Sequence, residues 1–432
     1  MILDAFAWTA IAGIVAIFAH TVRLWFISRT PAPRPSAPAA VGEFLFAFLV
    51  PALDEERVIG QTLDRLLALP VPHSLVLVID DGSGDATGKV VERHADPRVR
   101  LLRRDLPLAR RGKGDALNAG FRQLLAEVDG WPASKVIVGI MDADGRLDPH
   151  APGRVAEYFA DPGVGAVQVA VRIYNRHDNT LARLQDMEFV TYTDVFQAAR
   201  DRWGVAGLGG NGQFVRLAAQ LDLAPAPWTN GLTEDLEQGL RLISAGWRTR
   251  YCRSVAVHQQ GLVSMRQLLR QRSRWFQGHL QAWRQIRCII GRAPLRTVPH
   301  LLHFLLAPVL LLANAGLLAA LVVMLAGVAV SPAIRSLLAS PGVAVAWYWL
   351  TFALAMFLTV SVYVRREPGL RPRRIIALGH AYAGYALLWI VAGYWALARI
   401  LHGRHGWLKT ERLLERPSQL AATVETGGAN AH

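Results

Sequence analysis

Long apolar runs at both ends of the chain constrain its fold more than any other feature of the sequence. The four runs cover residues 2–27, 301–330, 343–364 and 375–401. At about 1.5 Å per residue, helices of this length cross a hydrocarbon core of roughly 30 Å. Apolar residues make up 52% of the chain and charged residues only 19%, a composition that excludes disorder and is unusual for a soluble domain. We therefore expect a protein that is integral to a membrane.

The segments around these runs indicate how the chain crosses the membrane. Four prolines follow the first run, so we interpret residues 1–28 as a retained transmembrane helix and residues 29–42 as an extended linker. The fourth run contains several glycines, and the loop before it and the tail after it are both basic. By the positive-inside rule both flanks belong in the cytosol, whereas a full crossing would separate them. Two alternatives stay open for this run: a re-entrant or interfacial segment, and an ordinary fourth span.

Between the apolar ends, residues 43–260 have the alternating pattern of an α/β domain. The expected strands of a mostly parallel sheet, each apolar almost throughout, are residues 44–50, 75–79, 99–102 and 136–141. Acidic clusters follow three of them, at residues 54–56, 80–81 and 142–144. Because ligands bind outside the carboxyl ends of the strands in such sheets, we expect these clusters to converge.

The convergent carboxylates predict a cation site. The whole chain has a formal net charge of +14, yet carboxylates gathered at one edge need a cation or hydrogen-bond donors to offset their repulsion. Asp142 and Asp144 offer hard oxygen ligands of the kind that Mg²⁺ or Mn²⁺ prefers, and the metal would bridge to a diphosphate. Residues 110–118 place glycines and cations at the start of a helix, a natural anion site that lacks the spacing of a P-loop.

The order of these motifs resembles the membrane-integrated family 2 glycosyltransferases, which include cellulose, chitin, hyaluronan and poly-N-acetylglucosamine synthases. The resemblance extends over nearly the whole chain and is carried by residues 50–56, 80–83, 113–118, 142–144 and 233–235 and by the Q-x-x-R-W sequence at 271–275. It implies a GT-A-like nucleotide-sugar-binding domain, inserted between transmembrane helices and exposed to the cytosol of a bacterial cell.

The resemblance also implies roles for single residues. Asp235 would be the general base that removes the proton of an acceptor hydroxyl. Gln271, Arg274 and Trp275 would close over the donor, and Arg274 would offset charge on the leaving diphosphate. Asp142 and Asp144 would hold the Mg²⁺ or Mn²⁺. The substrate-binding residues expected from the resemblance are Ala52, Glu55, Asp80, Asp81, Lys113, Asp142, Gly210, Asn211 and Glu234.

The function implied is that of an inverting transferase that uses a nucleotide sugar, expected to be a UDP-sugar, to elongate a polysaccharide and pass it across the membrane. Accessory export proteins are candidate partners. The alternative is a single addition to a lipid acceptor, as in ceramide glucosyltransferases, which share Q-x-x-R-W. Residues 207–214 depart from the acceptor motif of cellulose synthases, which counts against cellulose itself.

A competing class is a non-catalytic membrane receptor or transporter that binds nucleotide or nucleic acid. It fits less well, because aromatic residues are not interleaved with Lys and Arg and no nucleic-acid motif is present. We therefore expect no nucleic-acid partner.

Residues 261–298 join the α/β domain to a C-terminal transmembrane region at 299–402, which a tail at 403–432 follows. Apolar residues and arginines recur at helical spacing in the joining segment, and Arg272 is one of these arginines. This pattern predicts amphipathic helices at the membrane surface, with arginines on anionic lipid. His258 and His279 lack a second ligand at metal spacing, so we interpret both as structural.

Overall fold

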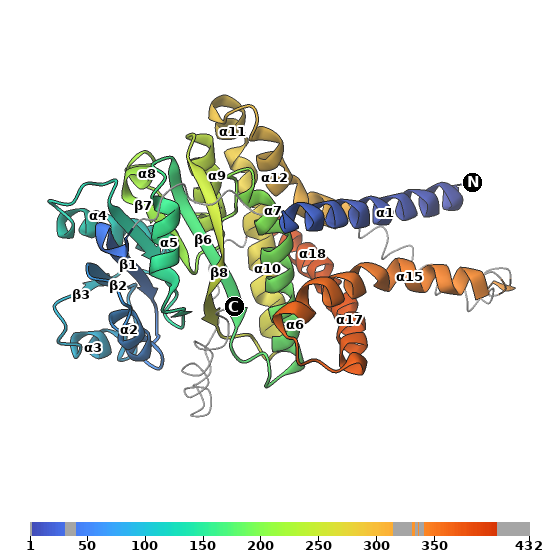
Figure 1. The fold of residues 1–432 in the computed structure, drawn as a ribbon, viewed down its shortest axis with the longest axis horizontal. Coiled ribbons are helices and arrows are strands. Elements are labelled where there is room, and N and C mark those ends of the chain that lie inside the picture. Colours follow the sequence, from blue (N-terminus) through green and yellow to red (C-terminus); the bar gives the residue numbers. More distant parts are fainter. Residues whose placement is uncertain (1, 31–39, 314–330, 333–335, 337–340, 404–432) are drawn as a thin grey trace.

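The structure is a computed structural model that describes residues 2–30, 40–313, 331, 332, 336 and 341–403. An α/β body contains an eight-stranded sheet, and long helices from both ends of the chain project from one side of this body (Figure 1). The strands of its sheet lie between Leu45 and Gln259, and the domain bounds 43–260 stay a prediction. Parts of the predicted linker (31–39), of the second apolar run (314–330) and of the tail (404–432) lie outside the described residues.

The sheet has the strand order β3-β2-β1-β4-β7-β6-β8-β5. Its strands are β1 (Leu45–Ala52), β2 (Ser74–Asp80), β3 (Val99–Arg103), β4 (Val136–Ile140), β5 (Arg146–Leu147), β6 (Val164–Ile173), β7 (Gln213–Arg216) and β8 (Arg248–Gln259). β1 is parallel to β2 and β4, and β2 is parallel to β3, so the four predicted strands form a parallel half. β7 is antiparallel to β4 and β6, and β5 is antiparallel to β8. β6 is parallel to β8, so the second half combines parallel and antiparallel pairs. The sheet as a whole is mixed, and the predicted parallel order holds throughout only in the first half.

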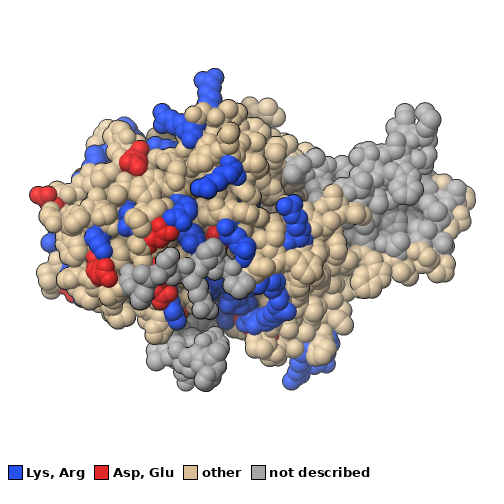
Figure 2. All heavy atoms as spheres, turned by 45° about the horizontal axis from the view of Figure 1, so that its top comes forward, with Lys and Arg blue, Asp and Glu red and all other residues tan. Residues whose placement is uncertain are grey.

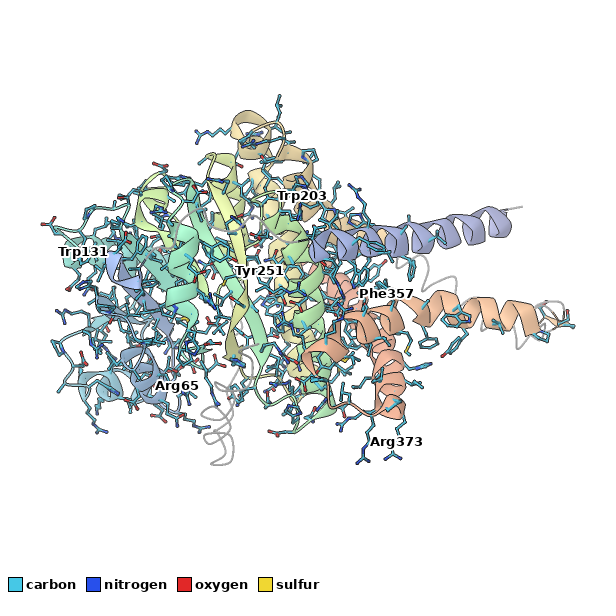
Figure 3. All side chains as sticks on the ribbon, viewed as in Figure 1. Arg65, Trp131, Trp203, Tyr251, Phe357 and Arg373 are labelled. Carbon is cyan, nitrogen blue, oxygen red and sulfur yellow. The ribbon has the colours of Figure 1, made fainter. Side chains whose placement is uncertain are left out.

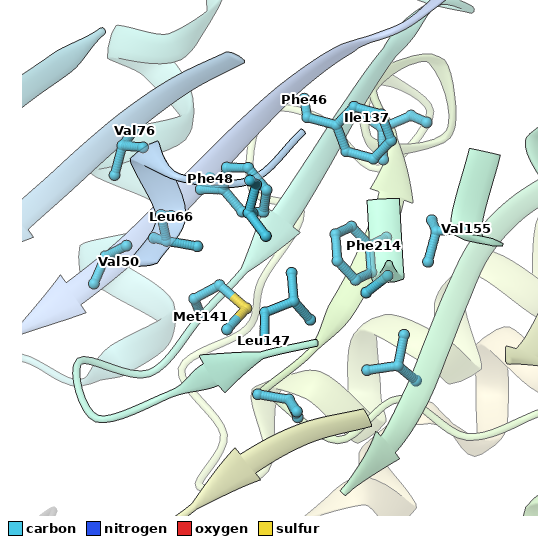
Figure 4. Close-up of a cluster of buried hydrophobic side chains, with 14 of the residues drawn as sticks. Phe46, Phe48, Val50, Leu66, Val76, Ile137, Met141, Leu147, Val155 and Phe214 are labelled. Carbon is cyan, nitrogen blue, oxygen red and sulfur yellow. The ribbon is translucent and has the colours of Figure 1, made fainter. Parts of the chain in front are cut away.

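The parallel half forms because its strands are apolar on both faces. Phe46, Phe48 and Val50 of β1 belong to one core cluster, which α2, α3 and α5 help to enclose (Figure 4). The alternate residues of β1, among them Ala47 and Leu49, belong to a second cluster, which α4 and α8 cover on the opposite face. Burial on both faces suits continuous apolar strands rather than alternating ones.

Short helices complete the body. These are the 3₁₀ turn η1 (Val41–Glu43), α2 (Ile59–Leu67), α3 (Thr87–Glu92), α4 (Lys113–Glu127), α5 (Ala151–Phe159), α6 (Thr180–Thr191), the π-helix η2 (Tyr192–Gln197), α7 (Ala198–Asp201), α8 (Leu217–Leu221) and α9 (Glu234–Ser244). α6 and η2 form one continuous helical stretch that packs against β6 and against α1.

The remaining helices connect the body to the apolar ends of the chain. They are α1 (Ile2–Arg29), α10 (Met265–Gln281), the 3₁₀ turn η3 (Ala282–Gln285), α11 (Ile286–Arg292), α12 (Val298–Ala313), α15 (Pro341–Leu358), the π-helix η4 (Thr359–Tyr363), α16 (Val364–Arg366), α17 (Pro372–Ala386) and α18 (Leu388–Leu401). α1 and α15 project from the body in a similar direction, whereas α17 runs across them (Figure 1). Phe357 joins the two projecting helices, with its ring centroid 5.3 Å from that of Trp25 (Figure 3).

The fourth apolar run forms two helices, with a break at Leu387. Among the described residues, the segment Pro372–Leu401 is the one helical stretch that is both long and apolar enough to cross a membrane. α18 packs closely against α10, which carries Q-x-x-R-W, and α17 packs against α15 and α6. The membrane crossings themselves stay predictions.

Candidate active site

A cavity of about 690 Å³ lies outside the carboxyl ends of β1, β2 and β4. Ala52 at the end of β1, Asp81 after β2 and Asp142 after β4 line it. Helices α10, α12, α17 and α18 supply the facing side, for example through Trp275 and Pro308. This is the edge of an α/β sheet at which ligands bind.

The site residues predicted from the sequence converge on this cavity. Its lining includes Ala52, Glu55, Asp81, Lys113, Asp142, Asp144, Gly210, Asn211, Glu234, Asp235, Gln271, Arg274 and Trp275. These residues come from strand ends, from the starts of α4 and α9 and from α10, which lie far apart in the sequence. Motifs selected for their chemistry therefore meet in one place, while the role of each residue stays a prediction.

Asp80 is the predicted site residue that does not line the cavity. Its side chain is fully buried beneath the loop, where Oδ1 accepts a hydrogen bond from the backbone N–H of Ser83 at 2.8 Å. Oδ2 accepts one from Arg103 at 3.1 Å. Because successive side chains of a strand point to opposite sides, Asp80 and Asp81 cannot both face the ligand edge. In this structure Asp80 shapes the loop from behind the cavity lining, and its contact with substrate stays a prediction.

The cavity is acidic, in contrast to the chain as a whole. Its lining carries seven carboxylates against two permanent cations. The carboxylates are Glu55, Asp81, Asp142, Asp144, Glu188, Glu234 and Asp235, and the cations are Lys113 and Arg274. Asp81 has a buried partner, because Arg104 donates to its Oδ1 at 2.6 Å, although burial still raises the pKa of Asp81. An anionic ligand entering this cavity would need a cation to accompany it.

The start of α4 explains the motif at residues 113–118. Lys113 Nζ lies 2.6 Å from Asp142 Oδ1, and although burial lowers the pKa of Lys113, the charges of Asp142 and Glu234 hold it raised. A Cβ on Gly114 would lie 2.0 Å from the carbonyl oxygen of Thr229, so only glycine permits this approach. Asn118 binds the backbone of Trp228 through both side-chain atoms. The motif thus carries two cavity residues, Lys113 and Ala116, and two residues that dock the helix.

Asp142 and Asp144 suit a divalent cation, but they supply only part of the ligands that it needs. Both line the cavity, and Asp144 is almost fully buried with Oδ2 accepting a hydrogen bond from the backbone N–H of Gln260 at 3.3 Å. Across the described ranges, no group of three or more His, Cys, Asp or Glu side chains gathers at ligand distance. Two carboxylates therefore form a partial site, in which the remaining ligands would be water and phosphate oxygens, as is usual for Mg²⁺.

Glu234 and Asp235 begin α9 and face the cavity. The first turn of α9 contributes here, since the backbone N–H of Leu236 donates to Asp235 Oδ1 at 2.8 Å. Burial raises the pKa of both carboxyls, and the Asp235 charge raises that of Glu234 further. Gly210, with φ +61°, passes so close that a Cβ there would lie 2.9 Å from Asp235 Oδ2 and 3.5 Å from Lys113 Nζ. A carboxyl with a raised pKa in a cleft is typical of an acid–base group.

α10 brings the Q-x-x-R-W residues to the same cavity, but not all of its arginines face outward. Arg272 is 1% exposed and its Nη2 donates to Glu188 at 2.7 Å. Tyr385 and Trp389, from α17 and α18, also donate to Glu188. The prediction that Arg272 contacts lipid is therefore wrong, because this arginine offsets a carboxylate inside the protein.

Several lining residues escaped the sequence analysis. They include Gln168, Glu188, Gln259, His279, Tyr382 and Trp389. His279 was expected to be structural, yet it lines the cavity one turn after Trp275, whose carbonyl oxygen lies 2.8 Å from His279 Nδ1. Burial lowers the pKa of His279. Metal spacing was the wrong criterion for this residue, whereas its i+4 relation to Trp275 could have placed it on the cavity face of α10.

The cavity changes character toward the projecting helices. There α12 contributes Ala307, Pro308 and Leu311 and α17 contributes Ala386, which are all apolar. The end near the sheet is rich in carboxylates, whereas α12 contributes only apolar side chains to the lining. A ligand that spans both ends would be polar at one end and apolar at the other.

Comparison with protein families and curated proteins gives the following relationships. Residues 43–278 match the sequence model of "Glycosyltransferase like family 2". A β-monoglucosyldiacylglycerol synthase from Synechocystis is 33% identical over 246 residues, which are 55% of this chain and 49% of that protein. A poly-β-1,6-N-acetyl-D-glucosamine synthase from Staphylococcus aureus is 29% identical over 234 residues, which are 54% of this chain and 53% of that protein. The match thus spans about half the length of these curated relatives.

The fold also has a solved counterpart. The mannosyltransferase PcManGT from Pyrobaculum calidifontis, solved in complex with GDP-Man and Mn²⁺, superimposes with a TM-score of 0.61 and 22% sequence identity. The superposition covers 91% of this chain and 98% of that one. It shows a shared GT-A fold, in agreement with the α/β architecture expected from the sequence.

Proposed function

Because the chain belongs to the glycosyltransferase-like family 2, we propose that it transfers a sugar from a nucleotide donor to an acceptor hydroxyl with inversion at the anomeric carbon. The acceptor oxygen forms its bond to that carbon while the bond to the donor diphosphate breaks, and the acceptor proton passes to Asp235. One displacement of this kind needs a base on the acceptor side and stabilisation of negative charge on the leaving side.

The two sides of the cavity supply these groups. Asp235 is the base, and the raised pKa that burial gives it makes its carboxylate a stronger proton acceptor than an ordinary aspartate. Arg274 and Lys113 stand in the same lining and offset charge on the leaving diphosphate. The observation that carries the proposal is that the base lies close to the groups that would face the leaving diphosphate. Gly210 adjoins both Asp235 and Lys113, and Lys113 donates a hydrogen bond to Asp142.

We assign Asp142 and Asp144 to a divalent metal, Mg²⁺ or Mn²⁺, held together with the donor phosphates. When bound, the metal would neutralise the departing diphosphate. Support comes from the acidic lining, which would otherwise repel that group, and from the Mn²⁺ in the complex of the Pyrobaculum mannosyltransferase. The family resemblance favours uridine as the nucleoside of the donor, although the Pyrobaculum enzyme was solved with GDP-Man.

Two acceptors are candidates. The apolar end of the cavity at Pro308 and Leu311 favours a membrane lipid with a free hydroxyl, and the 33% identical relative is a glucosyldiacylglycerol synthase. The indole rings of Trp275 and Trp389, whose centroids are 6.5 Å apart, favour a growing polysaccharide on whose sugars they could stack. The lipid is the better fit, because every lining residue that α12 contributes is apolar.

One assay tests both the sugar transfer and the choice of acceptor. Membranes that contain the full chain are incubated with radiolabelled UDP-glucose, UDP-N-acetylglucosamine or GDP-mannose and a divalent cation, and the label is separated into organic-soluble lipid and precipitated polymer. We expect label in the lipid fraction, and none with the Asp235→Asn variant as the matched control. Label confined to polymer would select the polysaccharide acceptor. Equal labelling by wild type and variant would contradict the proposed mechanism.

A further inference from the structure

A second pocket, of about 450 Å³, lies where α1 joins the body. Its lining consists of Trp25, Ser28 and Arg29 of α1, Asp194 of η2, Arg253 and Ser254 of β8, Ser361 and Val362 of η4, and Arg365 and Arg366 of α16. We call it the basic pocket. It shares no lining residue with the acidic cavity, so a ligand bound here is neither the sugar donor nor its acceptor.

The basic pocket has an excess of positive charge. Four guanidinium groups line it and Asp194 is its one lining carboxylate, which leaves three positive charges over. Arg366 donates to Asp194 at 2.7 and 2.8 Å and Arg253 donates at 3.1 Å, so this carboxylate is already shared. Arg29 donates to the carbonyl oxygen of Ser361 at 2.9 Å. Within the described part of the chain, neither Arg29 nor Arg365 has a carboxylate partner.

Hydrogen-bond donors accompany this charge. Ser361 Oγ and Trp25 Nε1 are buried atoms, and no described residue bonds to either of them. Buried polar groups normally have a partner, and each unsatisfied group lowers stability. The Ser361 hydroxyl, the Trp25 indole N–H and the nearby guanidinium groups are all hydrogen-bond donors. The oxygens of a phosphate group could accept hydrogen bonds from them.

The pocket stands at the boundary between the body and the projecting helices. Trp25 and Arg29 belong to the last turns of α1, and Arg365 and Arg366 follow α15 and η4. Lys and Arg side chains gather along this boundary on the visible face, whereas acidic side chains lie mainly on the body (Figure 2). Arg29 also lies 4.3 Å from the centre of the Trp25 ring, an arginine–tryptophan pair of the kind found at membrane interfaces.

We propose that the basic pocket binds a phosphoryl headgroup, and that an anionic membrane phospholipid supplies it. The guanidinium groups of Arg29 and Arg365 contact the phosphate, Ser361 Oγ and Trp25 Nε1 donate to its oxygens, and the acyl chains lie along α1 and η4. The lipid thereby fixes the body against the membrane at a pocket whose lining is separate from that of the acidic cavity.

Thermal unfolding of the purified full chain in neutral detergent tests this proposal, with short-chain phosphatidylglycerol, short-chain phosphatidylcholine and inorganic phosphate as the added probes. We expect phosphatidylglycerol to raise the unfolding temperature at concentrations where the other two probes have little effect. Arg365→Gln removes an exposed side chain that has no ion pair, so the fold should not suffer. This variant should need about fivefold more phosphatidylglycerol for the same shift, since one arginine contributes roughly that factor at an anionic surface.

Arg373→Gln is the matched control, because it removes the same charge from an exposed position in α17 that points away from the molecule (Figure 3). It should respond to phosphatidylglycerol as the wild type does. Arg29→Gln gives a second test from the other side of the pocket. An equal loss in the Arg365 and Arg373 variants, or no loss in either pocket variant, would overturn the site. Equal shifts with inorganic phosphate would overturn the lipid as its source.

Discussion

Asp235 is the residue on which the proposed chemistry depends most. Asp235→Asn keeps the shape but cannot accept a proton, so kcat should fall by about 10²–10⁴-fold while the donor still binds. Burial raises the pKa of Asp235 above the usual value of about 3.9. The carboxylate is the active form, so wild-type kcat should decline as the pH falls through this raised pKa, earlier than an ordinary aspartate would cause. Donor affinity that is lost together with activity would reassign Asp235 to donor binding.

A substitution of Asp144 tests whether transfer requires a divalent metal. Asp144→Asn removes one of the two charged ligands, so transfer should fall at least about hundredfold while the unfolding temperature stays near that of the wild type. Excess EDTA should abolish wild-type transfer, and Mg²⁺ or Mn²⁺ should restore it. Undiminished turnover in EDTA would show that Lys113 and Arg274 offset the charge of the diphosphate without a metal.

Gly210 combines a left-handed backbone with close contact to the proposed base. In Gly210→Ala the new Cβ would lie 2.9 Å from Asp235 Oδ2, in a conformation that itself disfavours alanine. Displacing the base by about 1 Å should lower kcat on the order of hundredfold. Gly209→Ala is the comparison, since its Cβ would meet only Gln168 at 3.8 Å and its φ is not positive. Similar losses in the two variants would mean that the whole loop, and not the contact with Asp235, matters.

At the scale of elements, the sequence analysis predicted the four strands of the parallel half and missed the other four, including β6, which is almost entirely buried. β1, β2 and β4 stand out because both of their faces are buried, whereas β3 is only half-buried. β7 begins with Gln213 and ends with Arg216, both fully buried and paired to other parts of the chain, and β8 begins with Arg248. Polar residues buried by specific partners look like surface residues in a sequence, because the pattern does not contain the partner.

The same reasoning explains why only some features of the candidate site were predictable from the sequence. The carboxylates at strand ends were predictable, because the sheet edge at which they meet follows from parallel topology. The burial of Asp80 under its own loop was not predictable, because it depends on Arg103 in a neighbouring strand. The contribution of Glu188 was equally hidden, since it requires α17 and α18 to fold back onto α10.

The packing of α17 and α18 against α10 around Glu188 yields a prediction for the stability of the protein. Arg272→Met leaves Glu188 buried without its cation, which should cost about 3 kcal/mol and lower the unfolding temperature in detergent by several degrees. The double variant Arg272→Met/Glu188→Gln removes both charges and should recover much of this loss. Losses that simply add in the double variant would show that the two groups do not interact. Arg270→Met, at an exposed position of the same helix, is the control and should change stability little.

At the scale of the whole molecule, the open question is whether α17 and α18 cross the membrane. α17 runs across the direction of α1 and α15, the helices break at Leu387, and α18 packs on α10 (Figure 1). Single cysteines at Arg371 and His402, both exposed, flank this segment in a background without Cys252 and Cys288. The positive-inside rule predicts that the basic loop before α17 is cytosolic. With a membrane-impermeant thiol reagent on intact cells, a re-entrant segment would therefore leave both positions protected. We expect this result, with Ser340→Cys labelled as the external control. Labelling of the cysteine at 402 alone would establish an ordinary fourth span.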